Sequence, residues 1–370
     1  MKILQILASL NVGGAEKFAV DLCNELAMEN DVYLCILDKI DNTMMLKQQI
    51  NENVTVISLN KTKSYSIGTV FNLYRLVKKL QPDIIHTHLR ALAYSSLYIL
   101  LLKVPVVHTI HNLAYKEAGN KIQKLYKLLF NYFNVTPVSI SQKVLESTEK
   151  VYGSKHTELI YNGVKALKKT DLYDHVRAEV DTYKKTKNTK VLLNVGRISK
   201  QKNQLMMIHV IKALNKVDLD FVLLFIGPLT DDKEYADQCI TNSENIPNIF
   251  FLGEKSNIGD YMHCADAFCL CSLYEGLPLV VLEAMSVGVP ILSTPAGGVP
   301  DIIQNGVNGY LSDDFTENAY KQMLVTFYSK TLSNHEENRK TYEENYSMHI
   351  CMNHYYELYE RLQLKDRGDL

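Results

Sequence analysis

The chain has 370 residues, 46% of them hydrophobic and 22% charged, and a formal net charge of −1. This is the composition of a globular protein long enough for two domains, and it excludes a disordered chain. No run approaches the roughly 18–20 apolar residues that cross a bilayer, and we expect neither a signal peptide nor a nucleic-acid partner. The seven cysteines include no C-x-x-C pair, which favours reduced thiols and a cytoplasmic location.

The near-zero charge hides a difference between the two parts of the chain. Residues 1–165 carry 19 Lys and Arg against 13 Asp and Glu, whereas the remaining residues carry 21 against 28. A basic first part suits an anionic partner such as a membrane surface, although chance alone also explains an asymmetry of this size.

The chain opens with a strand-like run from Lys2 to Ala8 and a helical pattern from Ala15 to Met28. Between them lies Asn11-Val12-Gly13-Gly14, where glycines let the backbone approach a ligand, or simply make a tight turn. Strand, glycine turn and helix are typical of a doubly wound α/β domain. The turn is not G-x-G-x-x-G, which argues against a nicotinamide oxidoreductase.

Strand and helix patterns then alternate, which predicts a parallel sheet covered on both faces. Strand-like runs lie at 32–37, 54–59, 84–87, 104–109 and 135–138, and helical patterns at 67–80, 90–102 and 120–133. Ligands of such sheets bind outside the carboxyl ends of the strands. His86, His88 and His111 follow strands at those ends, whereas His108 is expected to point into the sheet.

Residues 115–133 have the pattern of a basic amphipathic helix. The expected apolar face is formed by Ile122, Leu125, Tyr126, Leu129 and Phe133, and the expected basic face by Lys121, Lys124 and Lys127. Such a helix can lie on an anionic membrane, or it can cover the sheet with its lysines in water.

Tyr161-Asn162-Gly163-Val164 and the lysine-rich stretch up to Lys190 are interpreted as a linker between domains. A buried strand at 191–197 then leads through a turn into a helix from about 203 to 215. Arg197 and Lys202 flank this turn, and together they suit a diphosphate, although both are also ordinary surface charges. Further strands are expected at 221–227 and 249–253.

Residues 272–298 predict loop, helix, loop, strand and loop, with Pro278 as the first helical residue and Gly288 at the helix end. Glu275 and Glu283 bracket the helix start. Its backbone N–H groups, expected from Gly276, Leu277, Leu279 and Val280, favour an anion. Carboxylates that accept from hydroxyls, beside amides that bind a diphosphate, fit a sugar nucleotide; the alternative is an ordinary surface helix.

The sequence indicates neither a metal-bound diphosphate site nor a phosphate-binding P-loop. The one D-x-D, Asp218-Leu219-Asp220, precedes its strand rather than following it, and the histidines lack metal-ligand spacing. There is no G-x-x-x-x-G-K-[ST] loop. We therefore expect Arg197, Lys202 and a helix terminus to neutralise the diphosphate without a metal or other cofactor.

Several of these motifs resemble one family. Glu275, seven intervening residues and Glu283, within EGLPLVVLEAMSVGVPILSTPAGG, resemble the signature of the retaining family 4 glycosyltransferases with the GT-B fold. GGAE at 13–16, T-x-H at 109–111, N-G-V at 162–164 and G-R-x-x-x-x-K at 196–202 match further family motifs. FIGPL at 225–229 departs from the family's G-x-G, because Leu229 replaces the second glycine.

The resemblance implies two Rossmann-like α/β domains that face a cleft. Residues 1–165 would be the acceptor side and 166–345 the nucleotide-sugar domain, while a helix at 346–370, within a helical pattern that starts at Tyr342, would cross back to the first domain. The implied catalytic residues are His111, Glu275, Arg197 and Lys202, and His88 and Glu16 would lie on the acceptor side. The implied donor-binding residues are Gly13, Gly14, Arg197, Lys202, Gly253, Glu275, Gly276, Leu277, Leu279, Val280 and Glu283.

The implied reaction moves a hexose or N-acetylhexosamine, with retention and without metal, from a nucleoside-diphosphate sugar to a glycan. A UDP-sugar is the expected donor, and a glycan or polyprenyl-linked glycan of capsule, O-antigen or exopolysaccharide assembly is the expected acceptor. The protein would work in the cytoplasm, including at the inner face of the membrane. Two alternatives remain open: a UDP-sugar epimerase of GT-B shape, and a non-catalytic subunit that binds sugar nucleotides.

Overall fold

The computed structural model describes residues 1–11, 13–41, 44–62, 66–154, 156–217, 219–330 and 335–367. Val12 and Asp218, which belong to two of the sequence motifs, lie outside the described residues. The chain folds as two compact units, and each is described by itself. The first consists of Met1–Val164 and Met348–Leu370, and the second of Lys165–Ser347.

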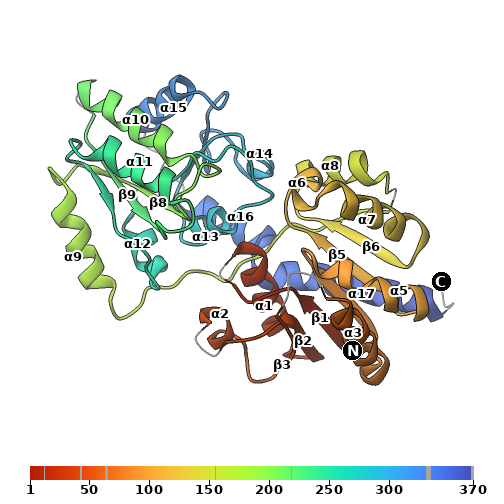
Figure 1. Ribbon diagram of the computed structural model, residues 1–370. Coiled ribbons are helices and arrows are strands. Elements are labelled where there is room, and N and C mark those ends of the chain that lie inside the picture. Colours follow the sequence, from red (N-terminus) through yellow and green to blue (C-terminus); the bar gives the residue numbers. More distant parts are fainter. Residues whose placement is uncertain are drawn as a thin grey trace. The chain divides into compact units, whose positions relative to one another are not determined.

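The first unit contains, in its described part, a parallel sheet of seven strands in the order β3-β2-β1-β4-β5-β6-β7 (Figure 1). The strands are β1 (Lys2–Leu7), β2 (Asp31–Asp38), β3 (Thr55–Lys61), β4 (Ile84–His88), β5 (Val106–Ile110), β6 (Val135–Ser139) and β7 (Glu158–Leu159). β1, β4 and β5 are almost entirely buried, as expected for central strands that are covered on both faces. The predicted strands of this unit are all present.

The helices of the first unit connect and cover these strands. They are α1 (Gly14–Leu26), α2 (Met45–Gln48), α3 (Ile67–Leu80), α4 (Ala91–Tyr94), α5 (Ser96–Leu101), α6 (Ala114–Glu117), α7 (Asn120–Tyr132), α8 (Gln142–Tyr152) and α17 (Met348–Arg367). Side-chain oxygens of Ser66 and Ser141 cap α3 and α8 by accepting from the backbone N–H three residues on.

Two predictions of continuous helices in this unit are wrong. The pattern at 90–102 forms α4 and α5, which meet at Ser95, whose hydroxyl donates back to the Ala91 carbonyl oxygen. The pattern at 115–133 forms α6 and α7, separated at Ala118 and Gly119, whereas the helix expected at 120–133 is confirmed as α7. The apolar residues named for the second pattern begin at Ile122, so they describe α7 alone and carry no information about the turn before it.

The C-terminal helix α17 packs on the first unit. Tyr355 and Tyr359 are fully buried there, and the backbone N–H of Met348 donates to the Val164 carbonyl oxygen at 2.9 Å. The prediction of one helix beginning at Tyr342 is wrong, because α16 (His335–Asn345) ends before α17 begins.

The second unit contains, in its described part, a parallel sheet of six strands in the order β10-β9-β8-β11-β12-β13. The strands are β8 (Lys190–Val195), β9 (Phe221–Ile226), β10 (Ile249–Phe251), β11 (Ala267–Leu270), β12 (Ile291–Ser293) and β13 (Gly309–Leu311). The remaining elements are α9 (Tyr173–Tyr183), α10 (Gln204–Leu214), the 3-10 helix η1 (Asn215–Val217), α11 (Lys233–Ser243), α12 (Ile258–Cys264), α13 (Leu279–Ser286), α14 (Val299–Ile302), α15 (Glu317–Ser329) and α16.

The interpretation of the stretch up to Lys190 as a linker needs correction, because it contains α9. Val176 and Val180 of α9 are buried, and the Tyr261 hydroxyl of α12 donates to the Glu179 carboxylate at 2.9 Å. Most other residues of α9 are charged or polar, so the two valines alone do not give a recognisable helical periodicity.

Helices and apolar side chains fill both faces of the second sheet. Cys269 and Cys271 are fully buried in this core, and all seven cysteines of the chain are unpaired, in agreement with the prediction of free thiols. No helix in the described ranges is both long and apolar enough to cross a bilayer.

Candidate functional site

The predicted site residues of the second unit lie on loops at the carboxyl edge of its sheet. β8 leads into Gly196 and Arg197, and β11 leads into the loop that carries Glu275. Because all six strands are parallel, these loops leave the same edge of the sheet.

A close ion pair joins two of these loops. The Lys202 ammonium lies 2.6 Å from the Glu275 carboxylate, although 73 positions separate them in the sequence. The side chains are only 15% and 9% exposed. A buried pair of this kind is positioned more rigidly than a surface pair, because each charge depends on the other for its solvation.

Four hydrogen bonds hold the Glu275 loop in place. The Leu273 N–H donates to the Gln201 carbonyl oxygen at 2.9 Å, and the Gln201 side chain donates to the Tyr274 carbonyl oxygen at 3.0 Å. From the loop after β12, the Thr294 hydroxyl donates to the Ser272 carbonyl oxygen at 2.7 Å, and the Gly298 N–H to the Gly276 carbonyl oxygen at 2.7 Å. Hydrogen bonds from the loops after β8 and β12 therefore hold the backbone of the loop that carries Glu275.

Gly297 allows this close packing. Its φ is +58°, in the left-handed region, and a Cβ on it would collide with the Glu275 carbonyl oxygen. Only glycine fits here without displacing the Glu275 loop.

The helix that follows begins slightly later than predicted. Pro278 is the N-cap of α13, not its first helical residue, so Gly276 and Leu277 precede the helix. Leu279 and Val280 are the first helical residues, whose N–H groups have no acceptor within the helix. Glu283 lies in the middle of α13 and is 9% exposed.

Arg197 has a different environment from Lys202. Its side chain is 56% exposed, and its Nη1 lies 3.3 Å from the Asp231 carboxylate on the loop after β9. A Cβ on Gly227 would collide with the Gly196 carbonyl oxygen, so the ends of β8 and β9 lie against each other. The Gly227 N–H donates to the carbonyl oxygen of Gly253, whose own Cβ position is open space.

In the first unit, Gly13 is the N-cap of α1 and Gly14 its first residue. A Cβ on Gly13 would collide with the carboxylate of Glu16 in the first turn of the helix. The glycine turn therefore brings the Glu16 carboxylate against the backbone that precedes α1.

The histidines of β4 and the one after β5 form a single hydrogen-bonded system with α17. His86 and His88 lie within β4, so the expectation that they follow this strand is wrong, whereas His111 does follow β5. His88 Nδ1 lies 3.0 Å from His111 Nε2, and His88 Nε2 lies 2.8 Å from the side-chain amide oxygen Oε1 of Gln5. His86 Nδ1 lies 2.6 Å from the Tyr359 hydroxyl, and its Nε2 lies 2.7 Å from the Thr109 hydroxyl. His86 and His88 are fully buried, whereas His111 is partly exposed.

Burial keeps these imidazoles neutral. It lowers the pKa of His111 to about 3 and holds the pKa of His86 and of His88 well below the usual value, because a charged ring would lose its hydration. Each ring therefore has one N–H donor and one acceptor nitrogen.

His108 is buried in the first unit, as predicted, against Tyr126 and Phe130 of α7. Its Nε2 lies 3.8 Å from the buried carboxylate of Glu117, a residue that sequence reasoning missed. Burial raises the pKa of Glu117 to about 8 and lowers that of His108 to about 3.

Other contact residues were also missed. Gln201 and Asp231 carry no motif, and Thr109 was counted only as part of T-x-H. Gln5 offered a signal, because it is a polar residue within the apolar run Ile3-Leu4-Gln5-Ile6-Leu7, where a buried amide needs partners.

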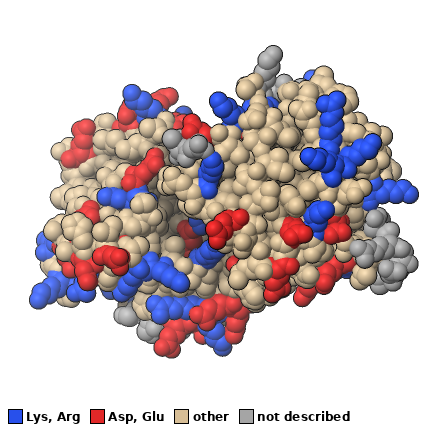
Figure 2. All heavy atoms as spheres, turned by 90° about the horizontal axis from the view of Figure 1, so that it is seen from below, with Lys and Arg blue, Asp and Glu red and all other residues tan. Residues whose placement is uncertain are grey.

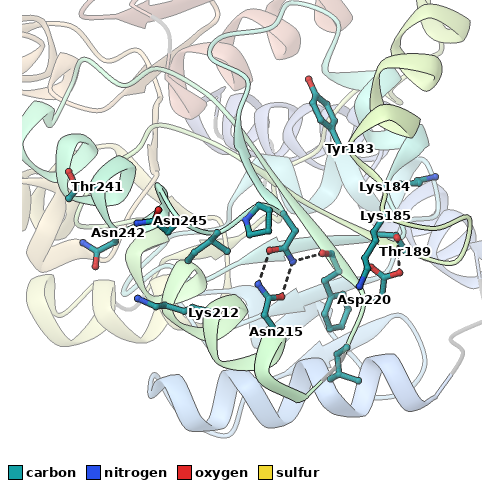
Figure 3. A pocket seen from close by; sticks show the side chains of 15 residues that line it. Tyr183, Lys184, Lys185, Thr189, Lys212, Asn215, Asp220, Thr241, Asn242 and Asn245 are labelled. Atoms are coloured by element: carbon teal, nitrogen blue, oxygen red, sulfur yellow. Dashed lines mark hydrogen bonds between the residues drawn. The ribbon is translucent and has the colours of Figure 1, made fainter.

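A hollow of about 720 Å³ in the second unit is lined by none of the predicted site residues. Thr189 and Asp220, which precede β8 and β9, lie beside it together with Lys185, Lys212 and Asn215 (Figure 3). The hollow is thus at the amino edge of the sheet, opposite the Glu275 loop, and we do not assign the donor to it. Among the described residues, no group of three or more His, Cys, Asp or Glu is arranged to hold a metal ion.

Two known protein families together match most of the chain. Residues 12–166 match the family described as "Glycosyltransferase Family 4", and residues 177–347 match "Glycosyl transferases group 1".

Two similar curated proteins are bacterial transferases. The chain is 28% identical over 264 residues to the UDP-Gal:alpha-D-GlcNAc-diphosphoundecaprenol alpha-1,3-galactosyltransferase of Escherichia coli, covering 66% of this chain and 65% of that protein. It is 26% identical over 361 residues to a Campylobacter jejuni alpha-1,4-N-acetyl-D-galactosaminyltransferase that acts on a diNAcBac-PP-undecaprenol glycan, covering 93% and 95%. The match thus spans just under two thirds of the first protein and nearly all of the second.

Among solved structures, Alr3699/HepE of Anabaena in complex with UDP and glucose has a TM-score of 0.81 at 20% identity. The match covers 98% of this chain and 100% of that one. At this identity the similarity shows the fold.

Proposed function

The chain belongs to the family 4 glycosyltransferases with the GT-B fold, and from that premise we propose that it transfers a sugar from a nucleoside diphosphate to a glycan. The proposed donor is a UDP-linked hexose or N-acetylhexosamine. The proposed acceptor is a glycan, free or polyprenyl-linked, in the assembly of a surface polysaccharide.

The buried pair of Lys202 and Glu275 is the observation that carries this proposal. It puts a cation and an acceptor-only carboxylate 2.6 Å apart at the carboxyl edge of the second sheet, next to the N-terminus of α13. A sugar diphosphate needs both, because its phosphates are anionic and its hydroxyls are donors.

In the proposed complex the second unit binds the donor. Glu275 accepts from sugar hydroxyls and Glu283 from ribose hydroxyls, while the amides of Leu279 and Val280 donate to phosphate oxygens. Lys202 and Arg197 stabilise the charge that develops on the leaving diphosphate. In this proposal no metal ion is required.

In the proposed reaction the acceptor hydroxyl oxygen attacks the anomeric carbon from the side on which the diphosphate leaves. The new C–O bond forms as the bond to the phosphate oxygen breaks. The hydroxyl proton passes to that oxygen, so the diphosphate carries it away. This route retains the anomeric configuration without a nucleophilic carboxylate.

The first unit is proposed to bind the acceptor beside Glu16, with His88 behind His111 on that side. His111 is proposed to act at the reacting sugar, and Gly13 and Gly14 to lie against the donor diphosphate. A lipid-linked acceptor would also explain why the first unit carries a basic surface on α7, because such a surface binds anionic lipids. Lys121, Lys124 and Lys127 on α7 are exposed, and so is Tyr132, at 78%. Figure 2 shows Lys and Arg side chains gathered at the upper right of the drawn face, above acidic ones. We propose peripheral contact with the cytoplasmic face of the membrane.

The first experiment is donor turnover. Purified protein is incubated with UDP-, GDP- and ADP-sugars, with and without chelator, and with a polyprenyl-diphosphate glycan as acceptor. Release of UDP that depends on the acceptor, resists chelator and fails in Glu275→Ala is the expected result. An acceptor-independent conversion of one UDP-sugar into its epimer would contradict the proposal, and so would binding without turnover under every acceptor tested.

A further inference from the structure

The hydrogen-bonded system around Gln5 connects the C-terminal helix to the proposed site residue His111. The Gln5 side chain donates from Nε2 to the Tyr359 hydroxyl at 3.2 Å and accepts at Oε1 from His88 Nε2 at 2.8 Å. Gln5 and Tyr359 are 354 positions apart and both are fully buried. No water competes for these bonds, so each donor must face an acceptor.

The directions of these bonds follow from the Gln5 amide as the structure orients it, with Oε1 towards His88 and Nε2 towards the Tyr359 hydroxyl. An amide oxygen can only accept, so the proton of His88 is on Nε2. The neutral ring of His88 then has a bare Nδ1, which accepts from His111. The proton of His111 is therefore on Nε2, and its Nδ1 is an acceptor.

The other branch of the system is consistent with the same directions. The Tyr359 hydroxyl accepts from Gln5 and donates to His86 Nδ1. His86 Nε2–H then donates to the Thr109 hydroxyl, which in turn donates to the Tyr355 hydroxyl at 2.8 Å. In this assignment each of these hydrogen bonds has one donor and one acceptor.

We propose that Gln5, His88 and Tyr359 are positioning residues that fix the tautomer of His111 and present its Nδ1 as an acceptor to a substrate hydroxyl. His111 is the partly exposed member of the system, and its Nδ1 makes no hydrogen bond to any residue that the structure describes. The ring is packed edge-on against Phe18 of α1, with centroids 5.7 Å apart, which restricts its rotation. The role of Nδ1 towards a substrate rests on the proposed function, whereas the tautomer does not.

This arrangement gives the C-terminal helix a part in the chemistry of the first unit. In the proposed complex His111 accepts a hydrogen bond from a substrate hydroxyl at Nδ1, while its Nε2–H stays hydrogen-bonded to His88. It therefore orients a sugar hydroxyl and is not the acid that protonates the leaving diphosphate.

The test is the tautomer itself, read from the ¹⁵N shifts of His111 in protein labelled at histidine, with His111→Gln to assign the signals. We expect a protonated Nε2 and an unprotonated Nδ1 at neutral pH. In Tyr359→Phe the Gln5 amide loses its fixed orientation, and both His111 tautomers are expected. Tyr355→Phe is the matched control on the same helix, since Tyr355 contacts Thr109 and not Gln5, and it should keep the single tautomer.

Activity gives a second readout. In Tyr359→Phe kcat should fall by up to about tenfold, the effect of one hydrogen bond, with Tyr355→Phe near the wild-type value. A protonated Nδ1 in the wild type, or one unchanged tautomer in both tyrosine variants, overturns the inference. An inactive protein with the expected tautomers supports the positioning and counts only against the proposed function.

Discussion

The carboxyl edges of the two sheets have the same topology but opposite electrostatics. In the second unit the edge carries ions: Lys202 pairs with Glu275 at 2.6 Å, and Arg197 pairs with Asp231 at 3.3 Å. In the first unit the central part of this edge carries neutral groups, where imidazoles, a carboxamide and phenols are buried and linked by hydrogen bonds. The ion pair of Lys61 with Asp38 lies farther along this edge, at the ends of β3 and β2.

Under the proposed function this difference would let one architecture serve two kinds of ligand. A diphosphate needs fixed charges, because its own charge must be balanced as it leaves. Hydroxyls need donors and acceptors in a fixed direction, which neutral rings provide without the desolvation cost of a buried charge. The predictions below test this division.

The largest effect is expected at the buried ion pair. Glu275→Gln should lower kcat/KM by roughly 100-fold or more, because the sugar loses a charged acceptor and Lys202 loses its partner. Stability separates the two causes: Glu275→Gln and Lys202→Met should each be less stable than the double variant, which leaves no unpaired charge. Urea unfolding of the three proteins measures this, and additive losses would show that the pair is not coupled.

Charge reversal on α7 tests whether the basic surface of the first unit meets a membrane. Lys124→Glu with Lys127→Glu should weaken binding to phosphatidylglycerol vesicles by at least about 30-fold, since the loss of two basic residues at about 1 kcal/mol each gives that factor and the new carboxylates add repulsion. Lys212→Glu with Lys216→Glu in the second unit is the matched control. Sedimentation with vesicles gives the partition coefficients, and equal losses in both pairs would mean that α7 has no special role.

Arg197 tests the exposed part of the charged edge. Arg197→Ala should weaken UDP binding about tenfold, the order of one charge-assisted hydrogen bond, with little effect on thermal unfolding because the side chain is half exposed. Asp231→Ala removes its partner and leaves the guanidinium available, so UDP should bind at least as tightly as in the wild type. Titration calorimetry compares the two variants; a similar loss in both would point to the loop geometry instead.

The smallest effect on activity is expected at Glu117, which tests the neutral character of the first unit. Its pKa is raised to about 8 in the folded protein, above its ordinary value, so folding favours the protonated acid. This contribution to stability is complete below about pH 4.5 and is lost as the pH rises through 8.

Glu117→Gln cannot ionise, so its free energy of unfolding should decline less between pH 5 and 8 than that of the wild type. Glu146→Gln, at a carboxylate that is 54% exposed, should follow the wild-type curve. Urea unfolding at several pH values decides between them, and parallel curves for all three proteins would refute a buried neutral Glu117.

The amino-acid sequence was enough to predict the alternation of strands and helices, because apolar runs of strand length and helical periodicity are local properties of the chain. It also determined which loops follow the strands, and therefore that Arg197, Lys202, Glu275, His88 and His111 lie at carboxyl edges. The motifs at 13–16 and 275–283 carried the resemblance to the family 4 glycosyltransferases.

Which of these residues contact one another follows from the tertiary structure and not from any local pattern. Lys202 and Glu275 are 73 positions apart, and Gln5 and Tyr359 are 354 apart, so no local pattern connects them. The positions where helices break also follow from the fold. The same holds for the place of α9 in the second unit, because its short apolar face among charged residues is recognised only from the helix that packs against it. Protonation was likewise beyond the sequence, because the pKa of a histidine or glutamate depends on burial, and burial is a property of the fold.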